Sequence, residues 1–275
     1  MTAYFVSLLL AIAGLVQEPL PTELPSVRFN SGQNIVPYFE GWIRNPDGTY
    51  DLVFGYFNRN WKEELMLPPG PDNSVEPGGP DAGQPTYFLA RRQRWAYRLR
   101  VPADFGNKEV TWTLTAHGRT EKAYGNLLAA EEITDRVVSS NGNFNPGEGD
   151  PNEPPSIKIA NVQNATVSAP LTLTATVTDD GLPKPRPVPA PRANTSTFGA
   201  QINSSGNAAL RGLNVRWLQY SGPAKVAFDA SGPMPVVNGR AVTAAHFSQP
   251  GTYHLRAIAS DGALSTTTDL VITVK

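Results

Sequence analysis

The stretch from Phe247 to Val274 constrains the fold of this chain more than any other part of the sequence. It contains a Pro-Gly turn, a strand, a tight Asp-Gly turn and a last strand in which apolar and polar residues alternate. Asp-Gly favours a tight turn, because Gly tolerates a positive φ and Asp hydrogen-bonds its own backbone. The stretch therefore predicts two neighbouring strands of a β-sandwich.

The length and one polar segment indicate two domains. A chain of 275 residues is long enough for two domains, each with its own core. Residues 139–155 are polar, acidic and rich in Pro and Gly, which is typical of a flexible linker. The chain thus divides into a lead-in over 1–25, a first domain over 26–138 and a second domain over 156–275. The part before the linker is acidic, and the part after it is basic.

Composition excludes several classes of protein. Charged residues make up 17% of the chain and the net charge is -1, which argues against binding of nucleic acid. The chain has no cysteine, so it has neither disulfides nor thiolate metal sites. A secreted eukaryotic module of this size usually carries a disulfide, and its absence favours a bacterial envelope protein.

The N-terminal apolar run over 3–16 predicts export. Its length fits the core of a signal peptide and is short for a membrane span. The small residues Ala11 and Ala13 offer a cleavage site, but no Lys or Arg precedes the run. An uncleaved N-terminal anchor therefore stays open as the alternative, and we expect a secreted, periplasmic or cell-surface location.

The first domain reads as strands throughout. Strands over 35–44 and 49–57 flank the turn formed by residues 45–48, Asn-Pro-Asp-Gly, and predict a hairpin. Alternating strands over 91–101 and 110–116 predict a second hairpin. Residues 68–86 are expected to form a long loop, which in a compact domain is often functional. A short helical turn is expected over 129–135.

The second domain reads as a sandwich of seven short strands. Trp217 falls on the third of them, where such folds place a core tryptophan. Tyr253 starts a strand at the position of a tyrosine corner, and Leu255 follows two residues later. We expect strands near 157–163, 170–178, 213–221, 224–229, 240–247, 252–260 and 266–274.

Residues 156–275 resemble the PKD-like and immunoglobulin-like modules of bacterial surface proteins. The resemblance is carried by Ala-Thr-Val-Thr-Asp-Asp-Gly-Leu-Pro at 175–183, Val-Arg-Trp-Leu-Gln-Tyr-Ser-Gly-Pro at 215–223 and the Pro-Gly-Thr-Tyr run described above. It implies a non-catalytic extracellular sandwich used for spacing, adhesion or contact with carbohydrate or protein. The chain departs from the pattern at 184–212, a Pro-, Ser- and Asn-rich insertion that is expected to be extended and disordered.

Residues 27–128 are similar to a domain of uncharacterised exported bacterial proteins. The similar stretches are Phe-Glu-Gly-Trp at 39–42, Asn-Pro-Asp-Gly-Thr-Tyr at 45–50 and Phe-Gly-Tyr-Phe-Asn-Arg-Asn at 54–60. This resemblance implies no activity.

Catalytic residue types are scarce. The only histidines are His117, His246 and His254, which fit ordinary strand and turn positions better than a triad. The adjacent carboxylates Glu63 and Glu64 point to opposite faces of a strand and do not form an acid–base pair. The sequence therefore predicts that the protein is not an enzyme.

An arginine face is the sharpest surface feature. In the strand over 91–101, four arginines alternate with apolar residues and share one face: Arg92, Arg94, Arg98 and Arg100. Like charges about 7 Å apart repel, so an anionic partner stabilises them. The alternative is a solvated face that nearby Glu and Asp residues neutralise.

Aromatic residues offer a second candidate contact. Trp61 follows a polar loop, and with Tyr56 it offers flat faces on which a sugar can stack. Trp95 and Trp112 lie on the apolar sides of their strands and are expected in the core.

Calcium is the only metal that the residues favour. Asp179, Asp180 and Asp261 lie in turns at one end of the predicted sandwich and offer hard oxygen ligands. The alternative is ordinary Asp-Gly turn chemistry without an ion. No other cofactor is expected.

Together these patterns predict an all-β protein: two β-sandwich domains joined by a flexible acidic linker, the second of them immunoglobulin/PKD-like. The function that fits is a non-enzymatic exported envelope or surface protein with a structural or interaction role. The alternatives are a carbohydrate-binding module and an accessory chain of an extracellular hydrolase. The expected partner is an envelope protein or polysaccharide, with no nucleic acid and with membrane contact only through the N-terminal segment.

Overall fold

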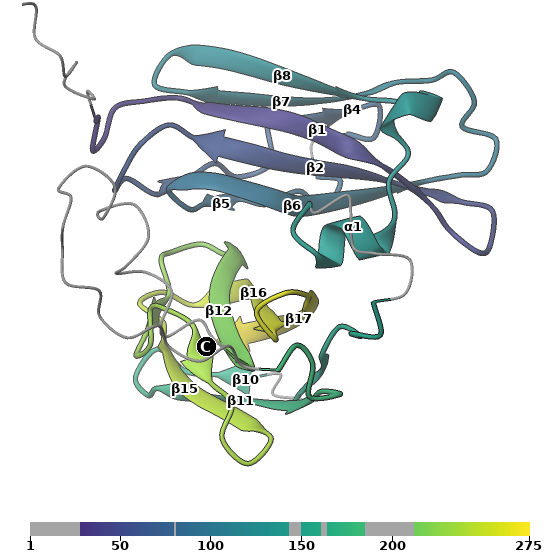
Figure 1. Cartoon of the computed structure of the whole chain (residues 1–275). Helices are drawn as coiled ribbons and strands as arrows, with labels where there is room; N and C mark the ends of the chain where they lie inside the picture. The colour runs from purple at the N-terminus through teal and green to yellow at the C-terminus, as the bar shows by residue number, and fades with distance from the viewer. Residues whose placement is uncertain (1–27, 80, 143–149, 161–163, 185–211) are drawn as a thin grey trace, which may run out of the picture.

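A computed structural model describes residues 28–79, 81–142, 150–160, 164–184 and 212–275 (Figure 1). The predicted signal peptide or anchor lies outside these residues, as does nearly all of the insertion predicted at 184–212. Within the described part, no helix is both long and apolar enough to cross a bilayer. The described chain is almost entirely β-structure, arranged as two sandwiches, one above the other in Figure 1.

The first domain packs two three-stranded antiparallel sheets over an aromatic core. Tyr97 and Trp112 meet in this core at 5.7 Å between ring centroids, each contributed by a different sheet. One sheet has the order β1 (Ile35–Arg44), β2 (Tyr50–Asn58), β6 (Arg91–Val101); the other has the order β4 (Asn73–Glu76), β7 (Val110–Ala116), β8 (Arg119–Gly125). A short pair is formed by β3 (Leu65–Met66) and β5 (Tyr87–Phe88).

The hairpin predicted from the Asn-Pro-Asp-Gly turn is confirmed. Strands β1 and β2 pair from Ile35 opposite Asn58 to Arg44 opposite Tyr50. Gly48 adopts a φ of +84° and donates its N–H to the carbonyl of Asn45 at 3.0 Å, which closes the turn. The turn thus sets the register from Arg44 to Gly41, and a bulge between Phe39 and Gly41 shifts the register of the rest of the pair.

The second predicted hairpin is wrong. Strand β6 pairs with β2, and β7 pairs with β8 and β4, so the connection over 102–109 crosses from one sheet to the other. Both strands alternate correctly, but their apolar faces oppose each other across the core instead of lying side by side. The predicted loop over 68–86 also contains β4, and β8 was not predicted.

A bulge in β6 moves Trp95 out of the main core. Phe54 lies opposite Tyr97 while Tyr56 lies opposite Gln93, so β6 carries extra residues at this point. Trp95 adopts a φ of +54° and packs with Val53 in a small cluster on the outer face of the sheet. The expected core position of Trp95 was therefore wrong, because residues inside a bulge leave the regular alternation of faces that Tyr97 keeps.

The second domain is an immunoglobulin-like sandwich, as predicted. Tyr253 is fully buried and donates its hydroxyl to the carbonyl of Gln249 at 2.8 Å, which forms the predicted tyrosine corner. Trp217 is buried in the same core as Leu255. Its five-stranded sheet has the order β10 (Asn164–Ala165), β17 (Ser265–Val274), β16 (Gly251–Ser260), β12 (Asn214–Ser221), β14 (Met234–Pro235), and its four-stranded sheet the order β13 (Ala227–Phe228), β15 (Arg240–His246), β11 (Leu171–Thr178), β9 (Ser156–Ile159).

The described ends of the predicted linker are packed against the domains. A single 3-10 turn, η1 (Ala129–Glu131), leads into the helix α1 (Asp135–Ser139), which lies between the two sandwiches in Figure 1. Asn152 is only 2% exposed and donates its side-chain amide to Asp261 at 3.1 Å. Residues 143–149 lie outside the described part.

Candidate functional site

Hydrogen bonds between the two sandwiches join them at a fixed junction. The Tyr220 hydroxyl on β12 donates to the carbonyl of Gly83 at 2.7 Å, and the N–H of Thr86 donates to the carbonyl of Tyr220 at 3.1 Å. Lys225 forms an ion pair with Glu64 at 2.6 Å. Backbone and side-chain contacts of this kind fix the orientation of one sheet against the other.

Arg256 on β16 is the centre of the junction. Its guanidinium binds both carboxylate oxygens of Asp269, at 2.7 and 2.9 Å, and donates to the Ala96 carbonyl of the first domain at 2.6 Å. It also lies over the Tyr220 ring at 4.4 Å. Burial alone raises the pKa of Asp269, but hydrogen bonds and charges from Arg256 and His254 outweigh it and hold that pKa well below its ordinary value.

A second set of contacts forms at α1. The hydroxyl of Ser139 donates to the Ser265 carbonyl at 2.8 Å, and the Ser265 hydroxyl donates back to the Ser139 carbonyl at 3.1 Å. Val138 on the same helix packs into the outer cluster of the first domain. The helix therefore connects the first sandwich to β17 of the second.

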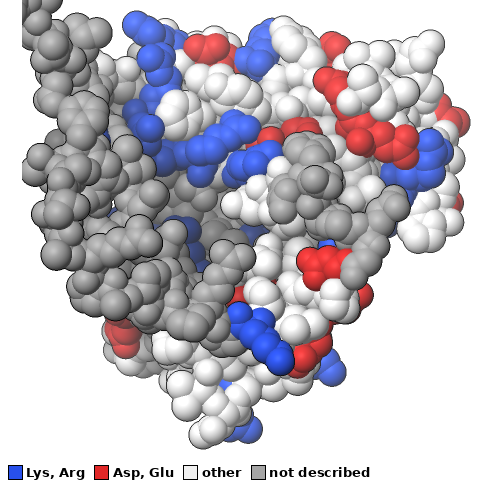
Figure 2. Space-filling model, viewed as in Figure 1, with Lys and Arg blue, Asp and Glu red and all other residues white. Residues whose placement is uncertain are grey.

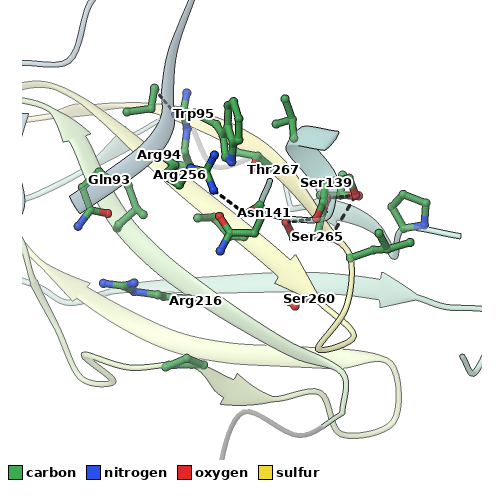
Figure 3. A pocket seen from close by; sticks show the side chains of 18 of the residues that line it. Gln93, Arg94, Trp95, Ser139, Asn141, Arg216, Arg256, Ser260, Ser265 and Thr267 are labelled. Carbon is green, nitrogen blue, oxygen red and sulfur yellow. Dashed lines mark hydrogen bonds between the residues drawn. The ribbon is translucent and has the colours of Figure 1, made fainter. Parts of the chain in front are cut away.

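A cleft of about 1950 Å³ runs along this junction, and both domains line it. Figure 3 labels Gln93, Arg94 and Trp95 of the first domain, and Arg216, Ser260 and Thr267 of the second, among the lining residues. Figure 2 shows Lys and Arg side chains gathered where the first domain meets the second. The lining combines cationic, carboxylate, hydroxyl, amide and aromatic groups, which is a set suited to a polar ligand.

Arg216 lines the cleft and has no counterion among the described residues. It lies on β12, is half-buried, and forms no hydrogen bond or ion pair with any described residue. Arg94, across the cleft, donates to the Asn141 carbonyl at 2.9 Å and lies 3.8 Å from Glu40. A half-buried guanidinium without a partner favours an anionic ligand.

Carboxylates from neighbouring elements pair with the arginines of the face predicted on β6. Arg92 pairs with Glu40 at 2.6 Å, Arg98 with Asp135 at 2.9 Å and Arg100 with Asp51 at 3.0 Å. Burial raises the pKa of Glu40, and the charges of the neighbouring arginines oppose that shift. This is the neutralised face named as the alternative, and the four predicted arginines need no external anion.

The two predicted aromatic contacts have different surroundings. Tyr56 is 3% exposed and its hydroxyl accepts the N–H of Leu89 at 2.9 Å, so its ring has no free face for a sugar. Trp61 is 40% exposed, as predicted for a loop residue. The guanidinium of Arg28 lies 4.5 Å and that of Arg91 4.3 Å from the centre of its ring. Trp61 thus lies in a basic pocket, and not on an open aromatic platform.

The carboxylate of each predicted calcium ligand accepts backbone N–H groups of its own turn. Asp179 accepts the N–H of Gly181, Asp180 that of Leu182, and Asp261 those of Ala263 and Leu264. In the described part of the chain, no group of three or more His, Asp or Glu is placed to hold a metal.

Two oxygen atoms near these turns nevertheless lack donors. One oxygen of Asp179 and the amide oxygen of Asn152 are buried without a hydrogen-bond partner. Burial, more than the nearby charges of Asp261 and Asp180, raises the pKa of Asp179.

Each of the three histidines lies beside a single carboxylate. His117 lies 3.1 Å from Glu63, and His246 lies 2.7 Å from Asp229. His254 lies 3.3 Å from Asp269, which also holds Arg256. These are contacts of ordinary strand and turn residues, as the sequence predicted for them.

The residues of the junction between the domains were not predicted from the sequence. Arg216 and Arg256 alternate with buried residues on their strands, so the pattern places them on the solvent face of the second sandwich. Nothing in the sequence indicated that the first domain covers this face. The one available signal was a cation at an outward position between two buried residues, Arg216 beside Trp217 and Arg256 beside Leu255.

Comparisons with known proteins give distant fold matches only. No family model matches the chain, and no curated protein matches its sequence. Among solved structures, the D00-D0 domain of Intimin is 12% identical with a TM-score of 0.27, covering 87% of this chain and 99% of that one. The adhesin InvE of Yersinia pseudotuberculosis is 10% identical with a TM-score of 0.25, covering 88% of this chain and 59% of that one.

An endo-fucoidan hydrolase from glycoside hydrolase family 107 is also similar. It is 13% identical with a TM-score of 0.25, and the match covers 90% of this chain and 27% of that one. At such scores the overall superposition carries no argument, and the immunoglobulin-like assignment rests on the strand order and the tyrosine corner of the second domain.

Proposed function

We propose that this protein is a non-enzymatic interaction protein of the cell envelope or surface, with a structural or adhesion-like role. The observation that carries the proposal is the junction, where Arg256, Tyr220 and Ser139 join two sandwiches so that one cleft spans both. A fixed pair of domains presents a contact surface that neither sandwich has alone. Such a surface is suited to recognition of a large partner.

A non-enzymatic role is supported by the way in which the reactive residue types are engaged. Each histidine is paired with a carboxylate on a strand or turn, and Asp269 is held by Arg256 and His254. General acid–base chemistry requires groups that converge on one reacting atom. The cleft-lining groups described above are instead donors and acceptors suited to binding.

A polysaccharide of the envelope is the partner that the cleft fits best. Arg216 offers a guanidinium for an acidic substituent, and Trp95 is a half-buried aromatic residue in the same lining. Ser260 and Thr267 bring hydroxyl groups, and Gln93 brings an amide. The predicted export of the chain, inferred from the apolar run over 3–16, places the protein where such polymers occur.

The test uses the absence of cysteine from the chain. Thr267→Cys places a single thiol in the cleft, and Thr172→Cys places one at an exposed position of β11 as the matched control. Each is coupled to a bulky maleimide and co-sedimented with envelope fractions and purified wall polysaccharides. We expect the unmodified protein to bind, the Thr267→Cys adduct to lose at least tenfold in affinity, and the Thr172→Cys adduct to bind normally.

Each part of this proposal has its own refuting result. Absence of co-sedimentation with every fraction refutes an interaction role. Equal retention of the two adducts refutes the cleft as the contact surface. Release of new reducing ends from a polysaccharide, measured in the same samples, refutes the non-enzymatic assignment.

A structural calcium ion is a second part of the proposal. It would be held at the linker end of the second domain by Asp179, Asp261 and the amide oxygen of Asn152, and Asp180 lies in the same turn. The support is the pair of buried oxygens without donors, because oxygen atoms beside carboxylates are the ligands that Ca²⁺ prefers. The ion would fasten the linker to the second sandwich.

A further inference from the structure

A small basic pocket on the first domain holds three arginines around one tryptophan. We call it the Trp61 pocket; it has a volume of about 400 Å³ and is lined by Arg28, Phe29, Gln33, Phe57, Arg59, Trp61 and Arg91. The guanidinium carbons of Arg28 and Arg91 lie 4.5 and 4.3 Å from the centre of the Trp61 ring. The pocket was not indicated by the alternation that revealed the neighbouring arginine face.

The three arginines of this pocket have no carboxylate partner in the described part of the chain. Arg59 donates to the Asn34 side chain at 3.2 Å, and Arg91 donates to the Arg59 carbonyl at 3.3 Å. Both acceptors are neutral. By contrast, Arg92, one residue further along β6, pairs with Glu40 at 2.6 Å. Positive charge is therefore neutralised on the arginine face and left uncompensated in the Trp61 pocket.

The backbone of Arg91 departs from the strand at this point. Its φ of +68° is uncommon for a residue other than glycine. The side chain of Arg91 lies over Phe57 and Trp61, whereas that of Arg92 lies over Tyr38. An uncommon backbone conformation that brings like charges together is a feature of binding sites, because structure elsewhere has to maintain it.

The pocket is also built rigidly. The N–H of Trp61 donates to the Phe29 carbonyl at 2.8 Å, and the N–H of Gln33 donates to Asn60 at 2.7 Å. Asn60 is fully buried and its amide returns a hydrogen bond to the Gln33 carbonyl at 2.8 Å. The loop that carries Trp61 is therefore fixed to the segment that carries Arg28. Little conformational entropy is then lost in this part of the chain when a ligand binds.

We propose that the Trp61 pocket binds the acidic group, carboxylate or sulfate, of one unit of an acidic polysaccharide. This inference goes beyond the cleft of the proposed function, with which the Trp61 pocket shares no lining residue, and it rests on that function for the class of partner. Guanidinium groups stacked on an indole keep their N–H edges free for an oxyanion, and they are suited to paired oxygens. The pocket volume accommodates a sugar unit, and the exposure of Trp61 leaves room for the chain to continue on both sides.

The test measures binding of the full-length protein to three polymers by titration calorimetry: polygalacturonate, sulfated dextran and neutral dextran. We expect binding of at least one acidic polymer and none of neutral dextran. Arg91→Gln is expected to weaken binding at least tenfold, since a charge-assisted hydrogen bond is lost. The matched control is Arg119→Gln, which removes an exposed arginine of the same domain outside the pocket.

A second readout reports on the pocket itself. Binding should change the tryptophan fluorescence of the protein, and the change should vanish in Trp61→Phe while affinity falls less than in Arg91→Gln. A fluorescence change that persists in Trp61→Phe would place the ligand elsewhere and overturn the proposal.

Further outcomes separate this inference from the proposed function. Binding to envelope fractions without binding to either acidic polymer overturns the pocket and leaves the interaction role intact. Equal loss in Arg91→Gln and Arg119→Gln means diffuse charge attraction and also overturns it. Polyglutamate or inorganic sulfate that binds as tightly as the sugar polymers overturns the sugar assignment. Failure to bind any fraction overturns both proposals.

Discussion

Removal of the Arg256 side chain should destabilise the protein more than removal of any exposed arginine. Arg256→Ala deletes the hydrogen bond to the Ala96 carbonyl, the two bonds to Asp269 and the stacking on Tyr220. Loss of a hydrogen bond to a charged group costs about 1.5–3 kcal/mol, and loss of a cation–π contact about 0.5–1 kcal/mol. Asp269 is partly exposed and keeps His254, so the lost ion pair adds little.

The expected loss in the free energy of unfolding is therefore about 3 kcal/mol. For a chain of this size that lowers the melting midpoint by about 6–12 °C. The assay is thermal and urea unfolding followed by circular dichroism, with Arg240→Ala as the control, since Arg240 is exposed and lies outside the junction. Small-angle scattering of the folded variant should show an increased radius of gyration, because the domains lose a central contact.

The same variant should change the acid response. The pKa of Asp269 lies below its ordinary value in the folded protein, so Asp269 contributes stability above pH of about 4, and this contribution is lost as the pH falls towards the folded pKa. Without Arg256 that part of the acid dependence should shrink, because His254 alone then lowers the pKa of Asp269. If Arg256→Ala melts within 1 °C of Arg240→Ala and keeps the wild-type acid profile, the assignment of Arg256 as the central junction residue is refuted.

Three further predictions follow from single contacts. Gly55→Ala should lower the free energy of unfolding by about 1–3 kcal/mol, because a methyl group there would come within 2.7 Å of the Gln93 carbonyl oxygen and would meet Glu40. Gly232→Ala is the control and should be neutral, because the space around Gly232 is open. Tyr253→Phe should cost about 1 kcal/mol through loss of the tyrosine corner, and an unchanged urea midpoint would contradict this. Millimolar Ca²⁺ should raise the melting midpoint of the wild type, and Asp179→Asn but not Asp229→Asn should abolish the rise; no response in the wild type would exclude the proposed ion.

The sequence by itself determined the long alternating strands and most of their buried faces. Alternation over two residues marked β6, β7 and β17, because successive side chains of a strand point to opposite sides of a sheet. Turn chemistry determined the β1–β2 hairpin, since only Gly48 readily adopts the required φ. The tyrosine corner was also readable, because the hydroxyl of Tyr253 reaches only four residues back along the chain.

Tertiary structure alone decided which strands pair and which charges remain free. Alternation is a local property, and it does not state whether β6 and β7 lie side by side or face each other across a core. The bulge that moves Trp95 outward likewise depends on how β6 fits against β2.

The candidate sites depend on the same long-range choices. The arginine face could be read from β6, but its neutralising carboxylates come from β1, β2 and α1. Arg216 faces a second domain, and Arg91 meets Trp61 through a backbone conformation that no residue pattern encodes. Whether a charged side chain has a counterion depends on its neighbours in space, and those residues lie far away along the chain.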